Sequence, residues 1–477
     1  MTDACRARPG ASCDHTQMDD TSDFSTLALS PQLKSGLDAL GYSKMTAVQA
    51  LSLPSILAGR DLIAQAPTGS GKTAAFGLGL LQQMDAGRSG TQALVLCPTR
   101  ELADQVGKQL RKLAIGIPNL KLSILCGGIP LAPQLASLTH APHIVVGTPG
   151  RVLELTEKGA LDLSAVSVFV LDEADRMLDM GFEEDIRALS KRMPKQRMGL
   201  LFSATFPDAI RALGTALLRD PVEVAVDAVE HRPDITARFI HTDPAKRVQQ
   251  LAALLMQYRP QSTVVFCNMR RDTVEVEQSL SHYGFSALSL HGDMEQRDRE
   301  EVLVRFANRS CSVLVASDVA ARGLDIDGID AVINYELPTD ADTYLHRIGR
   351  TGRAGRAGLA LSLVADSEDG RARVIDLHLG KATPWETVAA IEGRPRAVPQ
   401  APMVTLRIDA GRTDKLRPGD IVGALTGDVG LKKEAIGKID VFATRSYVAI
   451  AHPQAGQTLE KLRNGKIKGR KLRVHRL

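Results

Sequence analysis

The sequence predicts two tandem α/β domains followed by a small α+β domain at the C-terminal end. Short apolar, β-branched runs, such as 93–97 and 143–147, end near Gly, Pro or Asp and precede amphipathic stretches. This alternation is typical of parallel sheets with crossover helices. It stops at the polar stretch 227–235 and restarts with runs such as 262–267. A length of 477 residues fits two or three domains.

Composition places the predicted boundaries. Residues 1–23 are polar and acidic and are expected to form a disordered tail. The Pro-rich stretch 393–402 is expected to be a linker. The predicted domains and linkers are therefore the tail at 1–23, a first α/β domain at 24–226, a linker at 227–235, a second α/β domain at 236–392, a linker at 393–402 and a C-terminal domain at 403–477.

The C-terminal segment has a different order of predicted elements from the rest of the chain. Strands and helices alternate there as β-α-β-β-α-β, which is typical of an RRM-like domain. The expected elements are a strand at 404–408, a helix at 418–425, strands at 437–444 and 447–451, a helix at 457–462 and a strand at 471–474.

Charge is distributed unevenly along the chain. The formal net charge is +4, but 16 of the 59 basic and 7 of the 55 acidic residues lie between Met403 and Leu477. That segment therefore carries +9 and the rest of the chain −5. The asymmetry predicts a polyanion-binding module on a near-neutral body. A solvated basic tail is the alternative.

Neither a membrane span nor a secretion signal is predicted. No apolar run approaches the ~20 residues that a membrane-spanning helix needs. The N-terminal stretch is polar and acidic where a signal peptide would be apolar. The six cysteines are scattered without metal-ligand spacing and are expected to be reduced thiols. A cytoplasmic location is expected.

A phosphate-binding loop is predicted at 66–73, Ala-Pro-Thr-Gly-Ser-Gly-Lys-Thr, after the apolar run near Leu62. Glycines let backbone N–H groups surround phosphate, and the following helix adds positive potential at its N-terminus. Lys72 would reach the β- and γ-phosphates, and the Thr73 hydroxyl would coordinate Mg²⁺. An ordinary glycine turn is the alternative. The predicted nucleotide-binding residues of this loop are Ala66, Thr68, Gly69, Ser70, Gly71, Lys72 and Thr73.

An acidic tetrapeptide, Asp172-Glu-Ala-Asp175, directly follows the apolar run 168–171. A carboxylate at the tip of a buried strand beside a phosphate loop is suited to hold Mg²⁺, so Asp172 is predicted to bind the metal through water. Glu173 would then polarise the attacking water as general base. The alternative is an acidic helix start, which the helix dipole favours.

Three arginines occur in the pattern Arg347-Ile-Gly-Arg350-Thr-Gly-Arg353 of the second domain. Glycines between arginines allow a close approach to a transferring phosphate. Arginines supplied from a second domain would complete the site when the domains close, and such residues are worth roughly 10³–10⁵ in rate. A basic surface loop is the alternative interpretation.

Together these motifs resemble the DEAD-box RNA helicases from Phe24 to about Val364. The resemblance implies two RecA-like domains with ATP and Mg²⁺ at their interface. The matching motifs, in order, are Phe24, 41–49, the phosphate loop, Pro98-Thr-Arg-Glu-Leu-Ala103, Gly127-Gly128, Thr148-Pro-Gly-Arg151, Asp172–Asp175, Ser203-Ala-Thr205, Val264-Val-Phe-Cys-Asn268, Gln296 with Arg299, 317–325 and His346–Arg353.

The resemblance also implies roles for single residues. Phe24 would stack on adenine, Gln49 would bond its edge, and Asp325 would contact ribose. Ser203 and Thr205 would link the γ-phosphate to domain closure, His346 would help to bridge the domains, and Arg350 and Arg353 would reach the γ-phosphate. Residues expected along the RNA path are Arg100, Gly128, Thr148, Arg151 and Arg299, with phosphate-directed contacts that position without reading sequence.

The C-terminal segment resembles the RNA-binding domain of the DbpA subfamily. The matching stretches are 403–408, 417–427, 436–439 and 464–470. This resemblance implies recognition of a large-subunit ribosomal RNA hairpin and a role in ribosome assembly. An RRM usually stacks bases on aromatic residues of its central strands. Here the candidate strands offer Val404, Leu406, Tyr447 and Ala449, so the usual aromatic platform is depleted, and Tyr447 could equally be a core residue. Recognition is therefore expected to use Lys466, Lys468, Arg470 and Lys471.

The predicted function is an ATP-dependent RNA helicase that locally unwinds short duplexes. Its expected partners are RNA, a large-subunit ribosomal RNA hairpin and the pre-ribosomal particle, and it is expected to act as a monomer. One alternative is an ATP-gated RNA clamp or chaperone without ribosomal RNA specificity. A DNA helicase or a small-molecule kinase with a phosphate loop is another.

Overall fold

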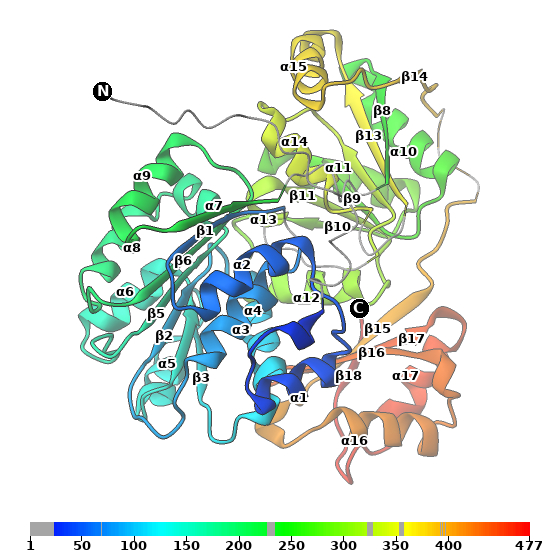
Figure 1. The fold of residues 1–477 in the computed structure, drawn as a ribbon. Coiled ribbons are helices and arrows are strands. Elements are labelled where there is room, and N and C mark those ends of the chain that lie inside the picture. Colours follow the sequence, from blue (N-terminus) through cyan, green and yellow to red (C-terminus); the bar gives the residue numbers. More distant parts are fainter. Residues whose placement is uncertain are drawn as a thin grey trace, which may run out of the picture. The chain divides into compact units, whose positions relative to one another are not determined.

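The computed structural model describes residues 23–67, 69–226, 234–321, 328–352, 357–391, 393, 395 and 397–477. The chain divides into two compact units, Met1–Glu230 and His231–Leu477. Figure 1 traces the chain through both, and each unit is described by itself.

The first unit is built on a seven-stranded parallel sheet. The strand order is β3-β4-β2-β5-β6-β1-β7. The strands are β1 Leu62–Gln65, β2 Ala93–Leu96, β3 Leu122–Leu125, β4 Ile144–Gly147, β5 Val168–Asp172, β6 Met198–Ser203 and β7 Val222–Ala225.

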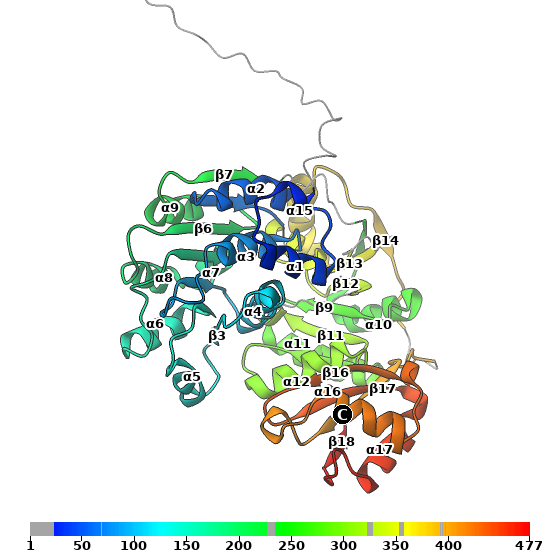
Figure 2. The ribbon, with the colours of Figure 1, turned by 60° about the horizontal axis from the view of Figure 1, so that its bottom comes forward.

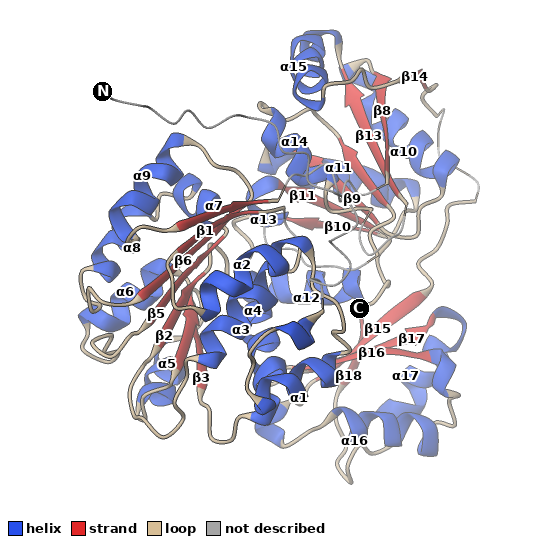
Figure 3. Cartoon of the chain, viewed as in Figure 1, coloured by secondary structure: helices blue, strands red, loops and turns tan. Residues whose placement is uncertain are grey.

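Helices cover both faces of this sheet (Figure 3). Along β1, Leu62 and Ala64 join one hydrophobic core while Ile63 joins the other. A strand buried on both faces must be apolar throughout, which explains the unbroken apolar runs of the sequence. The helices are η1 Phe24–Thr26, α1 Pro31–Leu40, α2 Ala47–Leu57, α3 Lys72–Gln82, α4 Arg100–Leu113, η2 Ala114–Gly116, α5 Leu131–Leu138, α6 Pro149–Glu157, α7 Ala174–Asp179, α8 Glu183–Ser190 and α9 Asp208–Leu217.

The second unit begins with another parallel seven-stranded sheet of order β10-β11-β9-β12-β13-β8-β14. Its strands are β8 Ile235–His241, β9 Thr263–Cys267, β10 Ala287–Leu290, β11 Val313–Ser317, β12 Ala331–Asn334, β13 Gly358–Val364 and β14 Trp385–Thr387. Its helices are η3 Pro244–Lys246, α10 Arg247–Tyr258, α11 Arg270–Tyr283, α12 Gln296–Ala307, α13 Asp318–Ala321, α14 Ala341–Ile348, η4 Asp366–Glu368 and α15 Asp369–Leu379.

The same unit ends in a small four-stranded antiparallel sheet, drawn in orange and red in Figure 2. Its order is β16-β17-β15-β18, and one face packs on two helices around a single core. The elements are β15 Met403–Ile408, η5 Arg412–Asp414, α16 Pro418–Gly423, a π-helical turn Ala424–Asp428, η7 Lys433–Ala435, β16 Ile436–Val441, β17 Ser446–Ala451, η8 His452–Gln454, α17 Ala455–Asn464 and β18 Val474–Arg476.

The predicted fold class is confirmed, with two RecA-like parallel sheets and a small α+β domain. Two strand limits in the last domain were wrong. The strand predicted at 471–474 begins at Val474. The strand predicted to run to Thr444 ends at Val441, because Phe442 N–H bonds Arg445 O at 2.7 Å to close the hairpin turn. The domain boundaries stay predictions.

Other sequence expectations concern membranes and thiols. Within the described part of the chain, no helix combines the length and apolarity needed to cross a bilayer. Cys97, Cys126, Cys267 and Cys311 are free and buried, whereas Cys5 and Cys13 lie outside the described residues. Burial raises the pKa of Cys126 to about 12.

Candidate active site

The phosphate loop connects β1 to α3, as predicted. Lys72 opens α3, is 6% exposed, and its Nζ donates to Ala66 O at 3.0 Å. Gly71 caps the helix with φ +97°, a conformation that side chains disfavour. A Cβ there would also lie 2.6 Å from Gln49 Nε2. Glycine is therefore required by both backbone conformation and space. Thr68 lies outside the described residues.

Gln49 supports the loop from α2. Its Oε1 accepts from Thr46 N–H at 2.9 Å, and its Nε2 donates to Gly71 O at 3.1 Å. The side chain is 4% exposed. Gln49 thus closes the first turn of α2 and ties that helix to the phosphate loop. Its predicted bond to adenine stays a prediction, and the contact with Gly71 is a role that sequence reasoning missed.

Phe24 lies in the core of the first unit at 5% exposure. Its ring stacks on Tyr42, with centroids 6.5 Å apart and planes 14° apart. Tyr42 is 36% exposed and was not among the predicted site residues. Stacking of Phe24 on adenine stays a prediction, and Tyr42 is the more accessible ring of this pair.

Asp172 is the last residue of β5 and is 2% exposed. Burial raises its pKa to about 7, although Lys72 acts in the opposite direction. Among the described residues its Oδ1 has no hydrogen-bond partner. A buried carboxylate oxygen without a partner is costly unless a cation or a donor joins it. The buried Asp172 carboxylate therefore fits a Mg²⁺ ion, whereas coordination by the Thr73 hydroxyl, in the first turn of α3, stays a prediction.

Glu173 follows in the left-handed region, at φ 55° and ψ 54°. This backbone conformation is costly for a residue with a side chain and is frequent at functional sites. The carboxylate is 4% exposed, and its Oε2 lies 2.9 Å from Nη1 of Arg176, which is equally buried. Arg176 was not a predicted site residue.

Asp175 joins α7 to the end of β6. Its Oδ2 accepts from Ala204 N–H at 3.1 Å, Thr205 N–H at 3.0 Å and the Thr205 hydroxyl at 3.1 Å. The Ser203 hydroxyl donates to Thr205 O at 2.7 Å, and Ser203 O accepts from Ala66 N–H at 2.9 Å. The acidic tetrapeptide, the 203–205 segment and the phosphate loop are therefore one connected network.

Four predicted RNA-path residues of the first unit lie at the carboxyl ends of the neighbouring strands β2, β3 and β4. A Cβ added to Gly128, whose φ is +65°, would collide with the Arg100 guanidinium. Thr148 Oγ1 accepts from Gly127 N–H at 3.3 Å. Arg151 donates to Ile129 O at 3.0 Å. The sheet thus gathers residues that are distant in sequence.

The predicted site residues of the second unit are described in part. Arg350 lies two residues beyond α14, is 6% exposed, and its Nε donates to His346 O at 3.3 Å. Arg299 on α12 donates to His291 O at 3.5 Å and to Ala320 O at 3.4 Å. Asp325 and Arg353 lie outside the described residues.

The basic residues of the C-terminal domain form an exposed hairpin between α17 and β18. Ile467 and Arg470 exchange backbone hydrogen bonds of 2.9 and 3.1 Å. Lys468 and Gly469 between them have φ of 53° and 73°, as in a type I′ turn. Lys466, Lys468, Arg470 and Lys471 are all exposed, and Lys468 pairs with Asp420 at 3.1 Å.

The predicted placement of Val404 and Leu406 on the RNA-facing side of this sheet was wrong. Val404 and Leu406 point into the core, because they pair in register with the core residues Ile450 and Val448. Successive side chains of a strand alternate between faces, so the other face carries the next residues along β15. These are Thr405 and Arg407, which pair with Ala449 and Tyr447.

That face is covered by α12 and the turn after it, within the same unit. Arg407 forms an ion pair with Glu301 at 3.3 Å, and the Tyr447 hydroxyl donates to the same carboxylate at 3.5 Å. Thr405 contacts the Ser310 hydroxyl at 2.5 Å. Burial and Glu301 raise the pKa of Tyr447 to about 12. Tyr447 is therefore an interface residue, 3% exposed, and offers no open ring.

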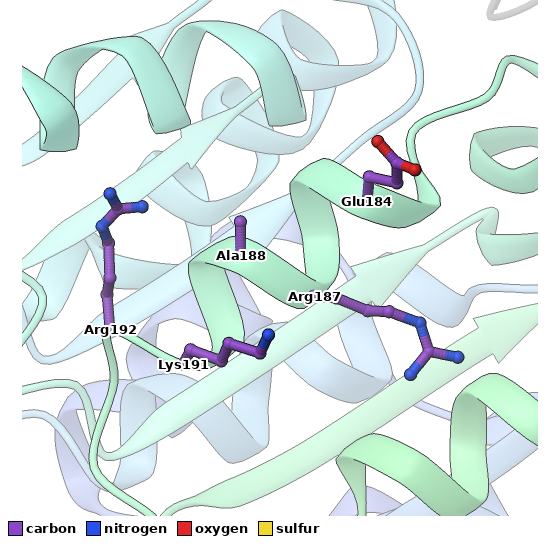
Figure 4. A pocket seen from close by; sticks show the side chains of 5 residues that line it. All are labelled: Glu184, Arg187, Ala188, Lys191 and Arg192. Carbon is purple, nitrogen blue, oxygen red and sulfur yellow. The ribbon is translucent and has the colours of Figure 1, made fainter.

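A surface depression on α8 is shown in Figure 4. Its lining residues are Glu184, Arg187, Ala188, Lys191 and Arg192. Arg187 pairs with Glu183 at 2.9 Å and Arg192 with Glu157 at 3.5 Å. None of the lining residues is a predicted site residue.

Comparison with known proteins assigns the chain to a family. The DEAD/DEAH box helicase model matches residues 46–213, the helicase conserved C-terminal domain model 246–355, and the DbpA RNA binding domain model 405–476. The ATP-dependent RNA helicase DbpA of Escherichia coli (strain K12) is 51% identical over 455 residues, or 95% of this chain and 99% of the relative. The chain belongs to the DEAD-box RNA helicases.

Other relatives agree with this assignment. The DEAD-box ATP-dependent RNA helicase CshA of Bacillus cereus is 42% identical over 354 residues, covering 74% of this helicase and 67% of the relative. The structure of S. cerevisiae Dbp5 bound to RNA and ADP BeF3 has a TM-score of 0.69 at 30% identity, covering 77% of this chain and 95% of that one. The C-terminal match places this helicase in the DbpA subfamily.

Proposed function

We propose that the helicase hydrolyses ATP with one set of residues from each α/β domain. Lys72 would bind the β- and γ-phosphates, while Thr73 and Asp172 would hold Mg²⁺, which neutralises charge on the phosphates. Glu173 would accept the proton of the attacking water, and Arg350 and Arg353 would stabilise charge on the transferring phosphoryl group. Among the residues that the structure describes, Asp172 Oδ1 has no hydrogen-bond partner, which supports the metal assignment.

We infer further that the enzyme acts on short RNA duplexes by local strand separation. Arg100, Gly128, Thr148 and Arg151, with Arg299 of the second unit, would hold the backbone of one strand. Clustering of the first four at adjacent strand ends supports a single backbone path. Contacts of this kind position RNA without reading its sequence.

The choice of RNA would belong to the C-terminal domain. The target that we propose is a large-subunit ribosomal RNA hairpin, engaged during ribosome assembly by a cytoplasmic monomer acting on the pre-ribosomal particle. This proposal rests on the exposed basic hairpin at 466–471. The sheet face on which an RRM usually stacks bases is covered here by α12 and is therefore not open to RNA. Basic and polar contacts would therefore replace base stacking.

The test is RNA-stimulated ATPase of the full chain with ribosomal RNA fragments and with unrelated RNA of equal length. The variant Lys466→Ala/Arg470→Ala should reduce the preference for the ribosomal fragment about tenfold or more, because two polar contacts to the bases and shape of the hairpin, which unrelated RNA does not make, are lost. Lys432→Ala/Lys433→Ala is the matched control, since it removes two exposed charges from the same domain. An unchanged preference in the hairpin variant would contradict the proposal.

A further inference from the structure

Arg176 is a buried arginine beside the acidic tetrapeptide, and it has no role in the reaction proposed above. Its side chain is 5% exposed, as is that of Glu173, and its Nη1 lies 2.9 Å from Glu173 Oε2. A charged group that is removed from water is costly unless a partner of opposite charge or a hydrogen bond joins it. Arg176 and Glu173 therefore compensate each other in the interior of the first unit.

The place of Arg176 in α7 is not explained by the stability of that helix. Because α7 begins at Ala174, Arg176 is its third residue. A cation in the first turn lies near the positive end of the helix dipole, which disfavours it. Burial of an arginine also costs more side-chain entropy than burial of most other residues. The contact with Glu173 offsets these costs.

The helix that carries Arg176 is itself fixed at two places. Ala174 and Met177 are fully buried in one of the hydrophobic cores of the first unit. The Arg176 N–H donates to Asp175 Oδ1 at 3.0 Å, and Asp175 Oδ2 accepts from Thr205 N–H at 3.0 Å. The guanidinium therefore extends from a rigid backbone that is tied to the segment after β6.

The carboxylate of Glu173 takes Arg176 as its partner in place of the helix backbone. Glu173 is the N-cap residue of α7, yet its side chain makes no capping hydrogen bond. A polar N-cap side chain usually accepts from the backbone of the first turn. Here the hydrogen bond runs from Arg176 Nη1 to Glu173 Oε2, so the ion pair sets the direction of the side chain.

We propose that Arg176 is a positioning residue that holds the Glu173 carboxylate in place for proton transfer. Arg176 binds Oε2, and Oε1 accepts the proton of the attacking water. The water oxygen forms the new bond to the γ-phosphorus as the bond to the ADP oxygen breaks. This inference rests on the general-base role proposed above for Glu173. It assigns Arg176 no contact with nucleotide, metal or RNA.

The test measures steady-state ATPase of the full chain at saturating RNA. Arg176→Met keeps the apolar stem and removes the charge, so kcat should fall about 10- to 100-fold, as expected for a misplaced catalytic group. The KM for ATP and the RNA concentration for half-maximal stimulation should stay within about twofold, because no ligand-binding residue is changed. Arg176→Lys should keep kcat within about fivefold of wild type, because a contact made by one nitrogen can also be made by an ammonium.

The double variant Glu173→Gln/Arg176→Met separates positioning of the base from general damage to the site. If Arg176 acts through Glu173, the substitution Arg176→Met should reduce kcat no further once the base has been removed. Independent effects would instead multiply, and the double variant would then be slower than Glu173→Gln alone.

Arg197→Met is the matched control. Arg197 is a partly buried arginine of the same unit, donates to Pro194 O at 2.7 Å and lies 5.5 Å from the Phe169 ring centroid. It directly precedes β6, at the opposite end of that strand from Ser203. Its substitution should leave kcat unchanged even if the melting temperature falls.

Several results would overturn the inference. They are an unchanged kcat in Arg176→Met, no recovery of kcat in Arg176→Lys, an equal loss of kcat in Arg197→Met, and a further loss when Arg176→Met is added to Glu173→Gln. Wild-type turnover in Glu173→Gln alone would instead refute the proposed general base, and the inference with it.

Discussion

At the scale of single residues, Glu173 combines a strained backbone with a buried ion pair. The left-handed φ of 55° carries the carboxylate out of the strand direction, and Arg176 holds it at 2.9 Å. Strain of this kind persists only where the surrounding contacts fix it. The backbone strain is therefore found at Glu173, the residue that we propose accepts the proton of the attacking water.

Glu173→Gln should reduce the ATPase rate constant by about 10²–10⁴, because the amide cannot accept the proton of the attacking water. ATP and RNA affinity should stay close to wild type, since the volume of the side chain is kept. Single-turnover hydrolysis together with nucleotide-binding titrations measures both. Hydrolysis at the wild-type rate in this variant would contradict the assignment of Glu173 as general base. An ATP-gated clamp that uses hydrolysis to release RNA would then need a different base.

If Asp172 holds Mg²⁺ as proposed, the binding of Mg²⁺ and nucleotide should depend on pH. Its pKa is raised to about 7, so the carboxyl is protonated in a growing fraction of molecules below that value. A metal that binds the ionised form must displace this proton. Affinity for Mg²⁺-ATP should therefore be nearly constant above pH 8. Below pH 7 it should decrease with each pH unit, and this decrease should approach about tenfold per pH unit.

The control for this dependence is Asp172→Asn, which cannot ionise. Its affinity should be weak and the same between pH 6 and pH 8, when measured by titration at a fixed excess of Mg²⁺. If the wild-type and the asparagine chains show the same pH dependence, the titrating group is not Asp172.

At the scale of elements, the hydrophobic pattern of the sequence predicts where the buried strands lie, but it does not predict which face of a strand is buried when that depends on pairing with another strand. The apolar runs of β2, β4 and β5 are recognisable because both faces of each strand are buried. In β15 only one face belongs to the core of the C-terminal domain. Val404 was assigned to the other face, so the predicted inward and outward residues of this strand were exchanged. Pairing with β17 decides the face, and the partner register is not visible in a single strand.

Turn geometry explains the remaining errors in the elements. Lys468 and Gly469 adopt positive φ, so the chain reverses direction there and the last strand begins later than predicted, at Val474.

The contacts of Gln49 with Gly71 and of Asp175 with Thr205 join residues 22 and 30 positions apart. Motifs indicated that these residues matter, but only the folded sheet determines which of them touch.

At the scale of the whole molecule, the residues that we propose for ATP hydrolysis belong to two different units. Lys72, Asp172 and Glu173 belong to the first unit, and Arg350 belongs to the second. Sequence order alone predicted this division. Because a covered sheet face joins the C-terminal domain to α12, the C-terminal domain also belongs to the second unit.

Arg350→Ala should lower the ATPase rate by about 10³ or more while leaving RNA affinity without nucleotide nearly unchanged. The physical reason is that the arginine stabilises charge that develops only during phosphoryl transfer. Steady-state ATPase and RNA titration of the same preparation measure the two quantities. Equal losses in rate and in RNA affinity would favour a plain RNA contact for Arg350.

We propose that the C-terminal domain directs this RNA helicase to a chosen RNA. The most direct measurement is ATP-dependent displacement of a short strand from a duplex joined to a large-subunit ribosomal RNA hairpin, compared with the same duplex joined to an unrelated hairpin. We expect faster displacement beside the ribosomal hairpin, and loss of that difference in Lys466→Ala/Arg470→Ala. Equal displacement rates on both substrates by the wild-type chain would contradict it.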